Sequence, residues 1–134
     1  MDYMKEERDR GITIRSACIS FNWENHQINI IDTPGHIDFN LEVERSLQVL
    51  DGAIVIIDGV NGVETQSETV WRQANKFGIS KLVFVNKLDR IGGNYEKSIE
   101  SIEMKLDCKV MSLQLPIVKD DSIVAIVDVV SMKV

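Results

Sequence analysis

The sequence is poor in the residues that define several protein classes, and each shortage excludes one of them. Its two cysteines, Cys18 and Cys108, are too few and too far apart for a disulfide framework or a zinc knuckle, so we expect two reduced, buried thiols. Two prolines and eight glycines among 134 residues argue against a fibrous or disordered chain. With 44% hydrophobic and 27% charged residues, the composition is that of one globular domain.

An excess of positive charge and a long apolar run are both missing. The 15 Lys and Arg against 21 Asp and Glu give a formal net charge of −6, which argues against holding nucleic acid by bulk charge. The longest apolar runs fall far short of the roughly 20 residues of a membrane-spanning helix. The first residues carry charges of both signs, unlike a secretory signal or a transit peptide. We therefore expect neither membrane nor DNA as a partner, and only local contacts with RNA.

Hydropathy patterning predicts an α/β chain. Residues 17–23 alternate like a half-buried strand and form a predicted hairpin with residues 27–31. Residues 53–57 and 82–85 are continuous apolar runs, the pattern of parallel strands covered on both faces by helices, so we expect one mixed sheet. Apolar residues at helical spacing predict three helices, marked by Val43, Leu47 and Leu50, by Val70, Trp71, Ala74 and Phe77, and by Ile99, Ile102 and Leu106. Strands and helices therefore alternate along most of the chain.

Capping residues and a change of pattern indicate where elements end. Gly78 suits the left-handed C-terminal cap of the second helix, and Asn94 is a candidate N-cap for the third. After Leu106 the pattern changes to short β-rich segments. We therefore divide the chain into an α/β domain, residues 1–111, and the start of a β-rich subdomain, residues 112–134.

The second predicted strand is followed by Asp32-Thr33-Pro34-Gly35-His36. In a doubly wound sheet, ligands bind beyond the carboxyl ends of the strands. There Asp32 can hold a hydrated Mg²⁺ that bridges nucleotide phosphates, Gly35 can bring its backbone N–H to a terminal phosphate, and His36 can orient an attacking water. Asp-Thr-Pro-Gly is also an ordinary turn sequence. The whole string would arise by chance in roughly one chain among tens of thousands, which favours the functional interpretation.

The last buried strand is followed by Asn86-Lys87-Leu88-Asp89. The Asp89 carboxylate can accept hydrogen bonds from N1–H and the 2-amino group of guanine, while Asn86 supports base and loop through its amide. Lys87 can lay its aliphatic stem along the purine. Adenine offers neither donor, and such a site can reject it by as much as about 10⁴ to 10⁵. This motif predicts guanine recognition.

Upstream, Thr13 ends the segment Arg10-Gly11-Ile12-Thr13. Its hydroxyl can ligate Mg²⁺ and its backbone N–H can reach a γ-phosphate, as in a switch segment that is ordered by a triphosphate. By itself, Thr13 is better explained as a β-former in a strand. Together the three motifs predict GTP and Mg²⁺ as ligands, with Thr13 and Asp32 on the metal.

These segments resemble the second, third and fourth motifs of the translational GTPases, and their surroundings are similar to the elongation factor G family. The similarity includes residues 7–14, 37–45 and 69–74 and covers essentially the whole chain. It implies a P-loop GTPase doubly wound sheet, with residues 1–111 as part of the GTP-binding domain and residues 112–134 as the start of an inserted β-rich subdomain. It also implies hydrolysis of GTP to GDP and phosphate.

The resemblance further implies residue roles that match the motifs. The GTP-binding residues would be Asp32, Thr33, Pro34, Gly35, His36, Asn86, Lys87 and Asp89, with His36 catalytic and Thr13 and Asp32 on Mg²⁺. The partner would be the ribosome, both its rRNA and its proteins.

Residues 20–23 and 113–117 resemble the mitochondrial ribosome-releasing branch of the family most closely. That branch implies an enzyme of the mitochondrial matrix that splits ribosomes together with a ribosome recycling factor. One alternative is a translocating elongation factor G, either mitochondrial or from the cytoplasm of a bacterium. Another is a truncated module or remnant that binds partners without hydrolysing GTP.

The sequence departs from the family pattern in one important respect. It contains no Gly-x-x-x-x-Gly-Lys-Ser/Thr phosphate loop, which family members carry upstream on a central strand. That strand would lie between the strands at residues 27–31 and 53–57. Because both would lose a partner, we expect the isolated 134-residue chain to be poorly stable, to bind GTP weakly and to be inactive alone.

Overall fold

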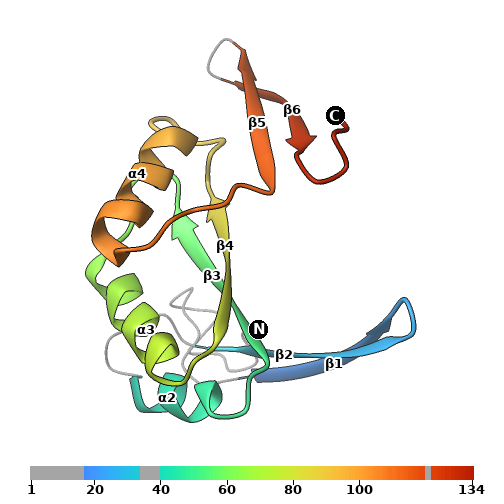
Figure 1. The fold of residues 1–134 in the computed structure, drawn as a ribbon, viewed down its shortest axis with the longest axis vertical. Helices are drawn as coiled ribbons and strands as arrows, with labels where there is room; N and C mark the ends of the chain where they lie inside the picture. The colour runs from blue at the N-terminus through green and yellow to red at the C-terminus, as the bar shows by residue number, and fades with distance from the viewer. Residues whose placement is uncertain (1–16, 34–39, 120–121) are drawn as a thin grey trace, which may run out of the picture. The chain divides into compact units, whose positions relative to one another are not determined.

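A computed structural model describes residues 17–33, 40–119 and 122–134 (Figure 1). In chain order the elements are β1 (Ala17–Trp23), β2 (His26–Asp32), α2 (Asn40–Leu47), β3 (Gly52–Asp58), α3 (Thr65–Lys76), β4 (Ser80–Asn86), α4 (Tyr95–Leu106), β5 (Gln114–Lys119) and β6 (Ser122–Asp128). Helices and strands alternate from β2 to α4, which confirms the α/β class. No helix in the described ranges is long and apolar enough to cross a membrane.

The described strands form three two-stranded sheets. β1 and β2 are antiparallel, β3 and β4 are a parallel pair, and β5 and β6 are antiparallel. Figure 1 shows β3 and β4 side by side. The sequence predicted that the hairpin and the parallel strands share one mixed sheet, but their hydrogen bonds are separate in this part of the chain.

The β1–β2 hairpin is closed by a tight turn. Trp23 pairs with His26, and the two residues between them, Glu24 and Asn25, have φ of 43° and 63°. Two successive positive φ values are typical of a type I′ turn, whose twist matches that of the flanking strands. The prediction that residues 17–23 are half-buried is wrong, because Cys18 through Trp23 are all exposed. Alternation indicates which side chains share a face, but a second element must cover that face to bury it.

The two cysteines are free thiols, as predicted. The Cys18 thiol is exposed, so the expectation of burial is wrong there, while Cys108 is half-buried. Burial, followed by the negative charges of Glu103 and Asp107, raises the pKa of the Cys108 thiol. A raised pKa keeps this sulfur protonated at neutral pH.

The chain divides into two compact units. One takes in the chain up to Ala53 together with Thr69–Ser80, and the other consists of Ile54–Glu68 together with Lys81–Val134. The core of the first unit is formed by Val43, Leu47, Ala74 and Ile79, with Leu50, Ala53, Val70 and Phe77 packed against it. Most of these are positions that the helical spacing predicted to be apolar faces, and burying them stabilises the unit.

The end of α3 is capped as the sequence predicted. Gly78 has a φ of +68°, a left-handed value that glycine adopts without strain. The N–H of Gly78 donates to Asn75 O at 3.0 Å, and the N–H of Ile79 donates to Ala74 O at 3.0 Å. These bonds satisfy carbonyl groups that the last helical turn leaves without partners.

The core of the second unit joins β3 and the following loop to α4. Ile57 and Val63 are fully buried, and Ile102 and Leu106 of α4 are 1% and 7% exposed. The N-cap prediction is confirmed, because the Asn94 side chain accepts a hydrogen bond from Lys97 N at 2.9 Å. α4 therefore begins and packs where its sequence predicts.

The parallel pair is buried on one face only. Large side chains alternate to the other face and are 52–69% exposed; they are Ile54, Ile56, Leu82 and Phe84. The prediction that helices cover both faces is therefore wrong for the described structure. A continuous apolar run shows that a strand is suited to burial on both sides, but it cannot supply the covering elements.

The β5–β6 hairpin is linked to the first turn of α4. The Tyr95 hydroxyl lies 2.7 Å from Ser112 Oγ and 3.2 Å from Gln114 O. The N–H of Val129 donates to Leu113 O at 2.9 Å. The predicted domain boundary between residues 111 and 112 stays a prediction.

Burial within α4 predicts a contrast between two substitutions. Ile102→Ala is expected to lower the free energy of unfolding by about 2–5 kcal/mol, because it opens a cavity in the second unit's core. Met104 lies on the same helix, and its side chain is 82% exposed. Met104→Ala should therefore change the free energy of unfolding by less than about 0.5 kcal/mol. Denaturant unfolding monitored by circular dichroism measures both, and equal losses would contradict this description of α4.

Candidate functional site

The carboxyl ends of β3 and β4 meet at one edge of the parallel pair. β3 ends with Asp58 and β4 ends with Asn86, and Lys87 follows directly. A cavity of about 210 Å³ opens here; its lining consists of Ile56, Asp58, Gly62, Glu64, Ser67, Asn86 and Lys87. Most of these side chains are polar, and this edge is where open α/β sheets bind ligands.

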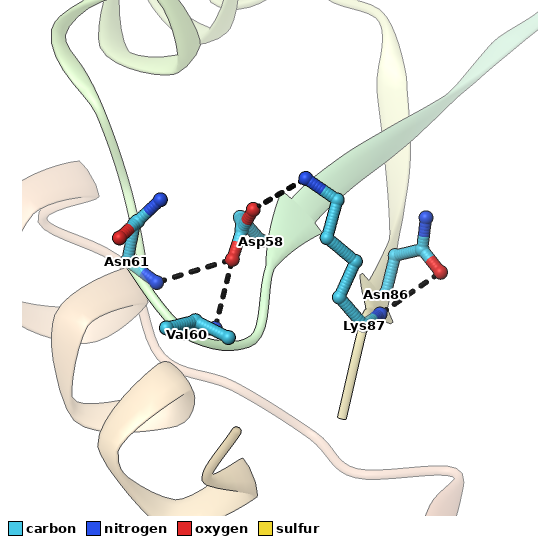
Figure 2. A network of polar contacts seen from close by, with 5 residues as sticks. All are labelled: Asp58, Val60, Asn61, Asn86 and Lys87. Atoms are coloured by element: carbon cyan, nitrogen blue, oxygen red, sulfur yellow. Dashed lines mark hydrogen bonds and ion pairs between the residues drawn. The ribbon is translucent and has the colours of Figure 1, made fainter. Parts of the chain in front are cut away.

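An ion pair connects the two strand ends (Figure 2). Lys87 Nζ lies 2.7 Å from Asp58 Oδ2, although the two residues are 29 positions apart in the sequence. The Asp58 side chain is 19% exposed and that of Lys87 is 42% exposed. Because the carboxylate is largely shielded from water, this contact is less screened than an ion pair on the open surface.

Asp58 also caps the turn that follows its own strand. Its Oδ1 accepts hydrogen bonds from the N–H of Val60 at 2.8 Å and of Asn61 at 3.1 Å (Figure 2). The Lys87 ammonium, followed by these two backbone donors, lowers the pKa of Asp58 to about 2. The carboxylate therefore stays ionised at every physiological pH.

The backbone at Lys87 is held in an unusual conformation. Its φ is +61°, a left-handed value that costs a residue with a side chain about 1–2 kcal/mol. Asn86 Oδ1 accepts the Lys87 N–H at 2.9 Å, and Lys87 O accepts the N–H of Arg90 at 3.2 Å. Together with the ion pair to Asp58, these contacts restrain Lys87 through its backbone and its side chain. Strain of this kind is concentrated at functional sites.

Gly59 connects the loop after β3 to the segment after β4. Its N–H donates to Asn86 O at 2.7 Å, and its carbonyl accepts the N–H of Asn94 at 3.0 Å. A Cβ atom at this position would lie 2.7 Å from Leu88 Cδ2 and 2.8 Å from Asn86 O. Only glycine allows such a close approach, so the two loops are in direct backbone contact.

Helix α4 holds the far end of the same loop. The Val63 N–H donates to Ser101 Oγ at 3.0 Å, and Lys105 Nζ donates to the Val63 carbonyl at 2.6 Å. The Val63 side chain is fully buried. Gly62 precedes it at a φ of +71°, and a Cβ there would lie 2.7 Å from Ser101 Oγ. The loop is therefore fixed to the helix by both polar groups of Val63.

The structure brings together part of the predicted site. Asn86 and Lys87 line the cavity, and Asp89 is an exposed residue of the same unit. Asp32 and Thr33 are half-buried at the end of β2, in the other unit. Thr13, Pro34, Gly35 and His36 lie outside the described residues. The meeting of all these residues around one ligand stays a prediction.

The metal site also stays a prediction. Of its two expected ligands, the described ranges include only Asp32. Within those ranges no group of three or more His, Cys, Asp or Glu could hold a metal ion. Its other expected ligand, Thr13, lies outside the described residues.

Sequence reasoning missed Asp58 as a site residue. It directly follows the apolar run at residues 53–57, as Asp32 follows the run at residues 27–31. The rule that ligands bind beyond the carboxyl ends of strands therefore applies equally to Asp58. Its sequence signal was available, but its partner Lys87 could be identified only from the structure.

Comparison with known proteins identifies the family. The family model described as the elongation factor Tu GTP binding domain matches residues 1–133. The chain belongs to this family. It is therefore a GTP-binding domain of the translational GTPases. The prediction of a partial P-loop GTPase fold is confirmed.

A solved structure agrees with this membership. A crystal structure of a protein from Thermus thermophilus matches 95% of this chain, with a TM-score of 0.86 and 28% sequence identity. This elongation factor Tu GTP-binding domain spans only 19% of that Thermus chain. The match therefore concerns the fold of one region of a longer protein.

The residues after β4 fit the guanine base that this GTP-binding family implies. Asn86 uses its carbonyl oxygen on the Lys87 N–H, which directs its amide N–H groups elsewhere. Asp89 is exposed, and a carboxylate can accept two parallel hydrogen bonds. The lysine stem lies between a fixed backbone and a fixed ammonium group. An acceptor, a donor and an apolar stem therefore lie within one short segment, and their convergence on one base stays a prediction.

The contacts of Asp58 predict its titration. In an NMR titration of its carboxyl carbon, the midpoint is expected near pH 2, and Lys87→Met should raise it while Val60 and Asn61 still hold it below the ordinary value of 3.8. Since a lowered carboxyl pKa stabilises the fold above the unfolded pKa, this contribution is lost only as pH falls from about 4 towards 2. A midpoint unaffected by Lys87→Met would show that the ion pair does not determine the pKa.

Proposed function

We propose that this chain is the nucleotide-binding part of a Mg²⁺-dependent GTPase that hydrolyses GTP to GDP and phosphate on the ribosome. The observation that carries the proposal is the restrained Asn86–Lys87 segment at the carboxyl ends of β3 and β4, in a chain of the elongation factor Tu GTP-binding domain family. A restrained segment of this kind is suited to selecting one base, since little entropy is lost when the ligand binds.

Guanine recognition is assigned to the segment after β4. Asp89 accepts hydrogen bonds from N1–H and the 2-amino group of the base, and Asn86 supports both the base and the loop. Lys87 lays its methylene groups along the purine while its ammonium stays on Asp58. An adenine nucleotide would leave the Asp89 carboxylate without donors, which is the basis of its rejection.

The phosphate end is assigned to the two predicted motifs upstream. Thr13 and Asp32 hold Mg²⁺, which neutralises charge on the phosphates when bound. Gly35 donates its backbone N–H to the γ-phosphate, and the fixed φ of Pro34 limits the movement of the loop. His36 orients the water that attacks the γ-phosphorus. A bond from the water oxygen to phosphorus forms as the bond to the GDP oxygen breaks, and the proton that the water loses passes to the phosphate product.

We propose the mitochondrial matrix as its location and ribosome splitting, together with a ribosome recycling factor, as its task. The support is the resemblance of residues 20–23 and 113–117 to mitochondrial ribosome-releasing factor 2. Translocation on the same ribosome is the alternative within the family. The two tasks are separated by incubating the complete protein and GTP with mitochondrial ribosomes and recycling factor. Dissociation into subunits is the expected result, and tRNA movement without dissociation would overturn this assignment.

Replacing the Asp89 carboxylate, the proposed acceptor for the base, tests guanine recognition. In the complete protein, Asp89→Asn is expected to weaken GDP binding about 100-fold or more. The side-chain amide NH₂ of the asparagine would face an N–H donor of guanine, where the carboxylate had offered an acceptor. Xanthosine diphosphate carries an acceptor at that position, so the variant should bind it better than the unsubstituted protein does. Fluorescent nucleotide titration measures all four affinities.

Asp107→Asn is the matched control, since Asp107 is an exposed residue at the end of α4 with a φ of 49°, which asparagine also tolerates. It should leave both affinities unchanged. If Asp89→Asn lowers GDP binding without any gain for the xanthine nucleotide, Asp89 does not read the base.

A further inference from the structure

The two oxygens of the Asp58 carboxylate perform different tasks. Oδ1 accepts the N–H groups of Val60 and Asn61 and so shapes the turn after β3. Oδ2 accepts from Lys87 Nζ at 2.7 Å, across to the segment after β4 (Figure 2). Because each task uses its own oxygen, a substitution can remove one and keep the other.

The turn that carries Asp58 is a firm support. The N–H of Gly62 donates to Asp58 O at 2.8 Å and closes the turn. Ser101 and Lys105 of α4 then hold both polar groups of Val63. Asp58 is thus restrained on one side by its strand and on the other by contacts that lead to a helix.

The segment on the opposite side needs such a support. Lys87 has a left-handed backbone without being glycine, so its conformation persists only where neighbouring contacts hold it. Two of these contacts come from the segment itself, through the Asn86 side chain and Arg90 N–H. The loop after β3 supplies two more contacts. Asp58 pairs with the ammonium group of Lys87, and the Gly59 N–H donates to Asn86 O.

We propose that Asp58 is a positioning residue for base selection, which acts through Lys87 to hold the Asn86–Asp89 segment in its guanine-reading conformation. The inference rests on the proposed guanine recognition and adds to it a residue that does not touch the nucleotide. Without the ion pair, Lys87 loses its anchor and the Asp89 carboxylate loses its fixed distance from the base.

Asp58→Asn removes only the contact with Lys87. The amide oxygen replaces Oδ1 on Val60 and Asn61, while the amide NH₂ replaces Oδ2 and cannot accept from an ammonium. Asp58→Ala removes both tasks. Asp128→Asn is the matched control, because Asp128 Oδ1 caps a turn after β6 in the same way, by accepting the Ser131 N–H at 2.7 Å.

The measurement is the affinity of the complete protein for fluorescent GDP and for its inosine analogue, IDP. Hypoxanthine keeps N1–H but lacks the 2-amino group, so a displaced Asp89 loses two hydrogen bonds to guanine and only one to hypoxanthine. For Asp58→Asn we expect GDP binding about tenfold weaker and a preference for GDP over IDP reduced at least about threefold. Asp128→Asn should change neither quantity.

The ratio separates positioning from a loss of folded protein. A smaller competent fraction weakens both nucleotides by the same factor and leaves the preference unchanged. Two results would overturn the positioning role: a preference for GDP over IDP that Asp58→Asn leaves unchanged, or a loss of affinity for both nucleotides that appears only with Asp58→Ala. Either result would mean that Asp58 only stabilises the turn after β3. An unsubstituted protein that binds neither GDP nor IDP would overturn the proposed function as well.

Discussion

The Asp58 carboxylate is shared between two segments, and the geometry of the site depends on how it is divided. One oxygen holds the turn after β3, and the other holds the ammonium of Lys87 at the end of β4. The Lys87 ammonium, followed by the N–H groups of Val60 and Asn61, lowers the pKa of Asp58 to about 2, so the carboxylate stays ionised far below neutral pH. The ends of the two parallel strands are therefore joined by an ion pair whose carboxylate stays ionised at physiological pH.

This contact explains why a strained backbone is tolerated at Lys87. The N–H of the left-handed Lys87 donates to the Asn86 side chain, and its carbonyl accepts the Arg90 N–H. Its side chain reaches the turn that α4 holds in place. Preorganised polar groups lose little freedom when a ligand arrives, so the strain is compatible with selective binding. The restraints that the described residues place on the Asn86–Lys87 segment come from the strand ends and, through the turn after β3, from α4.

Much of the fold followed from local patterns. The strands β1 to β4 lie within two residues of their predicted ends, and both predicted caps, Gly78 and Asn94, are present. Burial was predicted less well. Cys18 is exposed and Ile54 lies on an open face, because burial depends on an element from elsewhere in the chain, whereas periodicity reports only which residues share a face.

For the site, the sequence determined which chemical groups are available: the Asp32–His36 string and the Asn86–Asp89 segment, each placed after an apolar run. Their chemistry depends on residue type and local order, which the sequence contains directly. Only the tertiary structure decided that Lys87 pairs with Asp58 and that Gly59 touches Asn86. Those contacts join segments almost 30 residues apart, and they exist because parallel pairing of β3 and β4 brings the two carboxyl ends to one edge.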